Sequence, residues 1–223
     1  MDANDFKAKL VEEISNCDEI LGIGQTGDMN APLIPGKSDI DLFIICKKVP
    51  NAERRLSLYQ SFDALYEIVS DPETMQHYPA PFDEERTRGW ITWNLENYEK
   101  YGFGLWAVVL KETGAFIGDC GIFIQNIDGE MLPEIGYHIH KRYWRKGFGK
   151  EAARAARDWV FEHTDYDIVY SYMKYTNVGS YRTAIANGMK KVKEYADPKN
   201  TISYAYAITR EEWERNKMAK VFA

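Results

Sequence analysis

A short run of glycines and basic residues, at positions 145 to 150, has the composition of a loop that binds a phosphate-bearing ligand. It follows an apolar-rich run, Leu132–His140, and opens a helical pattern that continues to about His163. Gly147 and Gly149 carry no Cβ, so a phosphate could approach the backbone closely. The N–H groups of a helix's first turn lack intrahelical partners, and the helix dipole favours an anion there. The pattern predicts a ligand held through phosphate by the main chain, although a plain tight turn has the same glycines.

The residues around this loop resemble the acetyl-CoA-binding motif of GNAT N-acetyltransferases, in the branch that includes the ribosomal-protein N-terminal acetyltransferases. The resemblance covers about residues 62 to 210. It rests on several motifs in order, which are Ser70–Met75, Gly104–Val108, Ile117–Gly118, Glu134–Tyr137, Tyr143–Ala152, Asn177-x-x-Ser180 and Asn187–Met189. It implies an α/β fold with a mixed, mostly antiparallel sheet flanked by helices, in which a central pair of strands separates at the cofactor.

Acetyl-CoA is the co-substrate that this resemblance implies. The residues that would bind it are Trp144, Arg145, Lys146, Gly147, Phe148, Gly149, Lys150 and Asn177. Trp144 stands where many GNAT proteins have Gln or Arg, as is common in this branch. Asn177 would contact the pantetheine arm, but asparagine is also a frequent turn former, so a purely local role stays open.

Acetyl transfer to an amine requires one group that removes a proton from the amine and another that protonates the leaving thiolate. The resemblance implies Glu134 as the base, often through a water molecule. His138 is the competing base. These two residues are four positions apart and therefore share one face of a strand. The resemblance also implies Ser180 as the acid. Because Ala184 replaces the tyrosine acid of many GNAT proteins, Tyr181 is the alternative acid.

Aromatic residues nearer the N-terminus lie in the region that forms the acceptor pocket in similar enzymes. They are Tyr78, Phe82, Trp90 and Trp93, and His138 completes the expected substrate-binding set. Their spacing is equally typical of a packed helical core. The sequence leaves open whether the acceptor amine belongs to a small molecule or to the N-terminus of a peptide or protein. A non-catalytic acyl-CoA-binding module is a further alternative.

The beginning of the chain resembles a different family, the nucleotidyltransferases of the DNA-polymerase-beta type. Asp39 and Asp41 follow the glycine-rich run Gly22–Asp28 and have the spacing that holds Mg²⁺ for nucleotidyl transfer. This resemblance ends before a complete sheet can form. We therefore divide the chain into residues 1–53, a nucleotidyltransferase-like segment with a structural role beside the GNAT sheet, and residues 54–223, the acetyltransferase domain. A metal-dependent nucleotidyltransferase at the two aspartates is the alternative.

Composition narrows the classes of partner. The formal net charge is −6, so we expect no chain-wide nucleic-acid surface. A local basic patch suits one small polyanion and consists of Lys141, Arg142, Arg145, Lys146 and Lys150. The three cysteines form no CxxC pair, and His138 and His140 lack a further ligand nearby, so no metal is expected. Because no apolar run reaches membrane-spanning length, we expect no membrane association and a cytoplasmic monomer or homodimer.

Periodicity predicts the order of elements along the chain. Helices are expected at residues 4–16, 54–69 and 83–101, from the glycine loop to 163, and at 178–187, where Gly188 suits the helix end. Strands are expected at 20–23, 39–46, 105–111, 116–125, 131–140, 167–175, 190–195 and 203–209, with Asp128-Gly129 as a hairpin turn.

Overall fold

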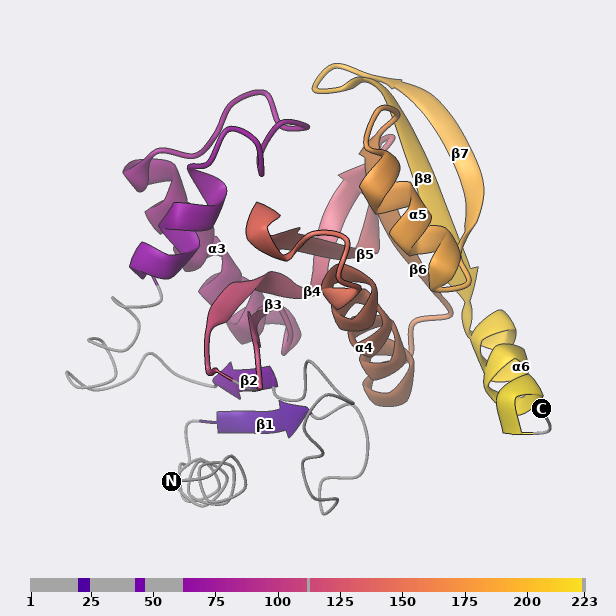
Figure 1. The fold of residues 1–223 in the computed structure, drawn as a ribbon. Coiled ribbons are helices and arrows are strands. Elements are labelled where there is room, and N and C mark those ends of the chain that lie inside the picture. Colours follow the sequence, from indigo (N-terminus) through magenta and orange to yellow (C-terminus); the bar gives the residue numbers. More distant parts are fainter. Residues whose placement is uncertain (1–19, 25–42, 47–61, 112, 222–223) are drawn as a thin grey trace.

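A six-stranded sheet forms the centre of the computed structural model, which describes residues 20–24, 43–46, 62–111 and 113–221 (Figure 1). The strand order is β3-β4-β5-β6-β8-β7. The strands are β3 (Leu105–Val109), β4 (Phe116–Ile127), β5 (Glu130–Ile139), β6 (Ile168–Lys174), β7 (Lys190–Asp197) and β8 (Thr201–Thr209). Every neighbouring pair is antiparallel except β5 and β6, which are parallel. The mixed, mostly antiparallel sheet expected from the sequence is confirmed.

The parallel pair at the centre of the sheet is joined at a single position. Glu134 of β5 lies opposite Tyr170 of β6, whereas β5 pairs with β4 from one end to the other. The hairpin between β4 and β5 turns at Asp128 and Gly129, which both have positive φ, as the predicted turn requires. The central strands therefore separate beside Glu134, and this confirms the expected splayed pair.

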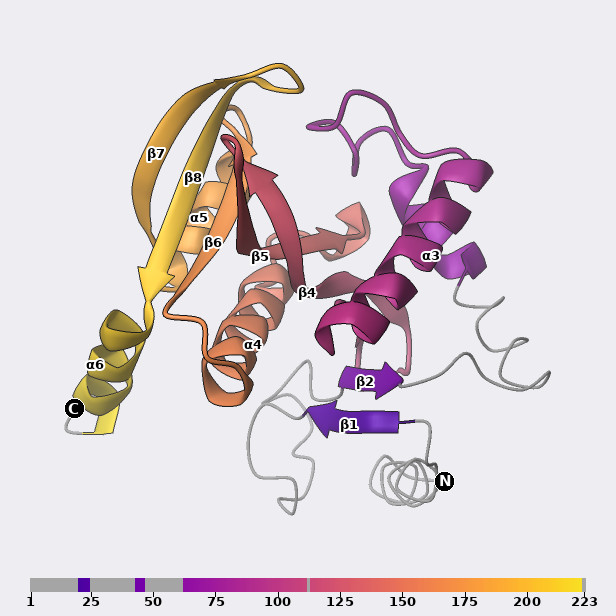
Figure 2. The ribbon, with the colours of Figure 1, turned by 180° about the vertical axis from the view of Figure 1, so that it is seen from behind.

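Helices cover both faces of the sheet. α4 (Phe148–His163) and α5 (Val178–Ala186) lie on one face (Figure 1), and α3 (Glu84–Tyr101) lies on the other (Figure 2). Ala152 and Ala156 of α4 are completely buried, and such small side chains let the helix approach β4 and β5 closely. None of the helices in the described part of the chain is both long enough and apolar enough to cross a membrane.

Specific polar contacts fix α3 against the sheet. Asp83 is its N-cap and accepts a hydrogen bond from the Arg86 N–H at 2.8 Å. The Asn94 side chain exchanges two hydrogen bonds with the backbone of Leu105, at 2.8 and 2.7 Å, as a neighbouring strand would. A second apolar cluster joins α3 to the segment before it, in which residues 62–69 are helical. Its buried members are Leu65, Ile68, Val69, Met75 and Phe82, with Trp90, Ile91 and Phe116 packed against them.

One helix was not expected from the sequence. α6 (Arg210–Val221) follows β8 directly. At its start, the Glu212 N–H donates to Thr209 Oγ1 and the Thr209 N–H donates to Glu212 Oε2, both at 3.2 Å. This reciprocal pair is a capping box, and the Thr-x-x-Glu pattern was the signal that predicts it.

The N-terminal strands form a small sheet of their own. β1 (Ile20–Gly24) pairs antiparallel with β2 (Phe43–Cys46), and β2 approaches β3 at the edge of the large sheet (Figure 1). Asp39 and Asp41 lie outside the described residues, as does the expected helix at 4–16. The predicted division of the chain after residue 53 stays a prediction.

Candidate active site

The glycine loop leads into the N-terminus of α4 through a short 3₁₀ helix, η1 (Lys141–Tyr143). Gly147 is the N-cap of α4 with a φ of 96°, a conformation that favours glycine. No side chain caps this end, and the first helical hydrogen bond runs from the Glu151 N–H to the Gly147 carbonyl. The N–H groups of residues 148–150 therefore have no intrahelical partner and converge on one position.

Two side chains of the loop hold it in place. The Trp144 indole N–H donates to the Ile139 carbonyl at 2.7 Å, and Phe148 is buried in the core. A Cβ added at Gly149 would lie 3.7 Å from Ile139 Cγ1 and 3.9 Å from Tyr137 Cε2, which are ordinary contacts. Packing within the protein therefore does not require glycine at position 149. The absence of a Cβ at this position leaves the backbone N–H groups accessible, and such a helix end can bind an anion such as a pyrophosphate.

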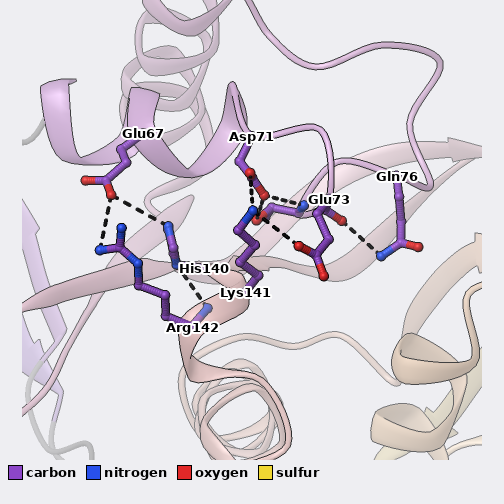
Figure 3. A network of polar contacts seen from close by, with 8 residues as sticks. Glu67, Asp71, Glu73, Gln76, His140, Lys141 and Arg142 are labelled. Atoms are coloured by element: carbon purple, nitrogen blue, oxygen red, sulfur yellow. Dashed lines mark hydrogen bonds and ion pairs between the residues drawn. The ribbon is translucent and has the colours of Figure 1, made fainter.

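The expected basic patch is divided by the structure. Lys141 forms ion pairs with Asp71 at 2.6 Å and with Glu73 at 3.2 Å, and Arg142 pairs with Glu67 at 3.5 Å (Figure 3). Arg142 thus connects η1 to helix 62–69, and Lys141 connects η1 to the segment that follows this helix. The exposed basic residues that remain beside the α4 N-terminus are Arg145, Lys146 and Lys150.

The Lys141 ion pairs also perturb their partner. Although partial burial opposes the change, the Lys141 ammonium and the Thr74 N–H and hydroxyl groups lower the pKa of Asp71 to about 2. The Gln76 side chain bonds to the Glu73 carbonyl at 2.9 Å (Figure 3). The Lys141 ion pairs therefore connect the start of the 70–82 segment to the chain that enters the glycine loop.

Glu134 occupies the point where β5 and β6 separate. Its side chain is buried, with 4% of the residue exposed. One carboxylate oxygen accepts a long hydrogen bond from the Tyr172 N–H, at 3.3 Å, and the other oxygen has no partner with hydrogen-bond geometry among the described residues. Burial raises the pKa of Glu134 to about 8, against smaller opposing effects of the Tyr172 N–H and the nearby Gln125 side chain. A carboxyl group in this state can exchange a proton near neutral pH.

The opposite face of β5 carries a hydroxyl pair. Tyr137 and Ser180 have their oxygens 3.2 Å apart, which joins β5 to the N-terminus of α5. Asn177 is the N-cap of α5 and accepts a hydrogen bond from the Ser180 N–H at 3.1 Å, which leaves its amide N–H groups to donate to a ligand. Burial raises the pKa of Tyr137 to about 12, although the Ser180 hydroxyl opposes this. Sequence reasoning missed Tyr137, because its partner lies 43 residues away.

Tyr181 lies apart from this hydroxyl pair. Its ring stacks on Tyr206 of β8, with centroids 6.4 Å apart and an interplanar angle of 11°. Ser180 is therefore the residue that the fold places with Tyr137, and Tyr181 packs against the core.

The aromatic residues of the acceptor region gather on the α3 side of the sheet. Trp90 and Trp93 stack with centroids 4.8 Å apart, and both rings meet Phe123 edge-on. His138 contacts the rings of Tyr78, Phe82 and Trp90. The predicted substrate-binding residues thus form one cluster, which packs against the face of the sheet that carries Glu134.

A buried aspartate organises this cluster. Asp119 of β4 lies opposite His138 and accepts hydrogen bonds from the His138 N–H at 2.9 Å and from the Trp90 indole N–H at 3.3 Å. His138 Nδ1 is 2.8 Å from Asp119 Oδ1, the oxygen that also accepts from the His138 N–H, and His138 Nε2 is 2.8 Å from the Tyr78 hydroxyl. Sequence reasoning missed Asp119. A buried polar residue within the strand 116–125 was the only available signal.

Comparisons with known proteins identify the family to which this fold belongs. Residues 54–190 match the family model of the acetyltransferase (GNAT) domain. Uncharacterized protein YkkB of Bacillus subtilis is 35% identical over 134 residues, which are 59% of this chain and 78% of YkkB. Uncharacterized N-acetyltransferase YnaD of the same organism is 29% identical over 162 residues, 70% of this chain and 91% of YnaD. The crystal structure of an acetyltransferase from Agrobacterium tumefaciens superposes with a TM-score of 0.60 at 25% identity, covering 82% of this chain and 99% of that protein.

The splayed central strands, the open N-terminus of α4 and the family match over more than half of the chain have one explanation. The chain belongs to the GNAT acetyltransferase family and is an acyltransferase whose co-substrate is acetyl-CoA.

Proposed function

We propose that this enzyme acetylates a primary amine and that Glu134 is the general base. The single observation that carries the proposal is the state of Glu134. It is buried at the strand separation, its pKa is raised to about 8, and one of its oxygens has no partner among the described residues. A base with a pKa near the working pH is efficient in proton transfer. The name of YnaD, an N-acetyltransferase, supports an amine acceptor.

The residues beside the α4 N-terminus would hold the co-substrate. We assign its pyrophosphate to the N–H groups of residues 148–150, with the charges of Arg145, Lys146 and Lys150 around it. Asn177 would donate to the pantetheine arm through its amide group. When bound, acetyl-CoA supplies an acetyl group activated as a thioester.

Proton movement is divided between the two faces of β5. Glu134 takes the proton that the amine loses as its nitrogen bonds to the acetyl carbon, directly or through a water molecule. Ser180 gives a proton to the sulfur as the carbon–sulfur bond breaks. Tyr137 then gives its own hydroxyl proton to the Ser180 oxygen, with which it shares a hydrogen bond. Because burial raises the pKa of Tyr137 to about 12, its hydroxyl keeps a proton to give at neutral pH.

A transfer assay tests this assignment. Thiol release from acetyl-CoA would be measured with an aminoglycoside, a polyamine and tripeptides that have a free N-terminus. With the best of these acceptors, Glu134→Gln should lower kcat by about 10²- to 10⁴-fold and leave acetyl-CoA affinity unchanged. Glu130→Gln, at the exposed start of the same strand, is the matched control and should remain active. A Glu134→Gln enzyme within about threefold of wild type would exclude Glu134 as the base.

A further inference from the structure

Three groups on the α3 side of the sheet form a chain of hydrogen bonds that ends at a surface side chain. Asp119 and His138 are buried, with 6% and 5% of each residue exposed, whereas 41% of Tyr78 is exposed. The Tyr78 hydroxyl nevertheless points inward, because it lies 2.8 Å from His138 Nε2. Tyr78 is 60 residues from His138 in the sequence, so the contact joins the 70–82 segment to β5.

The carboxylate of Asp119 sets the direction of this chain. An ionised carboxylate only accepts hydrogen bonds, so the histidine nitrogen that faces it must carry a proton. That nitrogen is Nδ1, which lies 2.8 Å from Asp119 Oδ1. In neutral His138 the other nitrogen, Nε2, is then an acceptor, and the Tyr78 hydroxyl must donate to it.

The direction determines what Tyr78 can offer to a ligand. Its only proton is directed at Nε2, so its oxygen lone pairs remain to accept a hydrogen bond. Glu134 precedes His138 by four residues on β5, so the proposed base and the Tyr78–His138 contact lie on the same face of that strand. Two acceptors, the Tyr78 oxygen and the Glu134 carboxylate, are thus placed on the same side of the sheet.

We infer that Asp119 and His138 are positioning residues that fix the Tyr78 hydroxyl as an acceptor for an N–H of the incoming amine, on the face of the sheet that carries Glu134. This assignment rests on the proposed transfer to a primary amine. It removes His138 from competition for the role of base, because both ring nitrogens are engaged. It also gives the ion pairs of Lys141 a purpose, since they hold the segment that carries Tyr78.

The state of His138 can be measured without any acceptor. Long-range proton–nitrogen NMR spectra of the full chain resolve the ring nitrogens, and the His138 signals are those missing from His138→Gln. We expect one protonated nitrogen, Nδ1, and one unprotonated nitrogen, Nε2, at neutral pH. A ring protonated on both nitrogens, or on Nε2 alone, would reverse the Tyr78 hydroxyl and overturn the inference. This readout does not depend on whether Glu134 is the base.

A double-mutant cycle tests the action through Tyr78, with the best acceptor of the amine panel. Tyr78→Phe should lower kcat/KM for the amine by about 10- to 100-fold, as expected for a hydrogen bond to a charged group. Asp119→Asn should cost a similar factor in the wild type and almost nothing in the Tyr78→Phe background. Tyr98→Phe, which removes a hydroxyl bonded to the Leu105 carbonyl at 2.6 Å, controls for loss of a structural hydroxyl. Independent, multiplicative losses from Tyr78→Phe and Asp119→Asn would contradict the inference.

Discussion

Glu134 and Asp119 are both buried carboxylates on the same face of the paired strands β4 and β5, but their surroundings differ. Asp119 receives three N–H groups, from the His138 backbone, the His138 ring and the Trp90 indole. Glu134 receives one long hydrogen bond, and one of its oxygens has no partner among the described residues. Burial of a charge is costly unless hydrogen bonds or opposite charges compensate it. The difference supports a structural role for Asp119 and, for Glu134, the proton exchange that we propose.

The first prediction concerns the stability of the protein and should show the largest effect. Burial raises the folded-state pKa of Glu134 to about 8, above the ordinary value of 4.5. Between these two values the folded protein binds more protons than the unfolded chain, so stability falls as pH rises. The contribution is fully present below about pH 4.5 and is lost as pH passes through about 8. It amounts to about 1.4 kcal/mol for each pKa unit of separation.

Glu134→Gln cannot ionise and should not show this loss. We measure the free energy of unfolding of both proteins by urea titration. The value for the variant minus the value for the wild type should increase by several kcal/mol from pH 5 to pH 8.5. Glu130→Gln should track the wild type at both pH values. If Glu134→Gln also tracks the wild type, Glu134 is as well satisfied as Asp119 and the contrast between them fails.

The second prediction concerns the pH dependence of the rate. Because only the ionised carboxylate accepts a proton, kcat/KM should rise about tenfold for each pH unit well below 8 and level off above it, a change of about 50-fold from pH 6 to pH 8. In Glu134→Gln the residual activity should lose this slope. A slope that persists in the variant would belong to the amine substrate instead.

The fold and half of the site follow from local sequence patterns. The glycine loop, the strand that carries Glu134 and the hairpin turn at Asp128 are each encoded within a few residues, and the structure has all three. The pairs Tyr137–Ser180 and His138–Tyr78 are 43 and 60 residues apart, so only the folded sheet brings them together.

Charge patterns were less informative than backbone patterns. The sequence places Lys141 and Arg142 with the other basic residues of the loop, but their carboxylate partners come from a distant helix and the segment after it. Asp119 gave only a weak local signal, because a single aspartate in an apolar strand does not reveal which donors will surround it. The partners of Lys141, Arg142 and Asp119 are all set by long-range contacts, which the periodicity of the sequence does not encode.

The third prediction tests the structural carboxylate by its stability. Asp119→Asn replaces one acceptor oxygen by an N–H donor, which must face either the His138 donors or the Trp90 indole. Leaving buried donors without a partner costs about 1–3 kcal/mol in the free energy of unfolding. We expect a loss of this size by urea titration at pH 7, opposite in sign to the gain of Glu134→Gln at pH 8.5. An Asp119→Asn protein as stable as wild type would mean that its three hydrogen bonds do not distinguish it from Glu134.

The last prediction has the smallest expected effect and concerns the ion pairs that hold the 70–82 segment, which carries the Tyr78 partner of the Asp119–His138 pair. Lys141 connects this segment to η1 through Asp71 and Glu73, and its ammonium is partly exposed, so the ion pairs should contribute little to overall stability. They should act instead on the position of Tyr78. We expect Lys141→Met to raise KM for the acceptor by roughly two- to fivefold, with kcat and acetyl-CoA affinity unchanged. Molar salt should raise KM of the wild type towards that of the variant, because it screens exposed charges.

Lys217→Met, which removes an exposed ion pair to Glu162, is the matched control and should leave KM unchanged. A change in acetyl-CoA affinity instead of acceptor KM would show that Lys141 serves the glycine loop and not the segment that carries Tyr78.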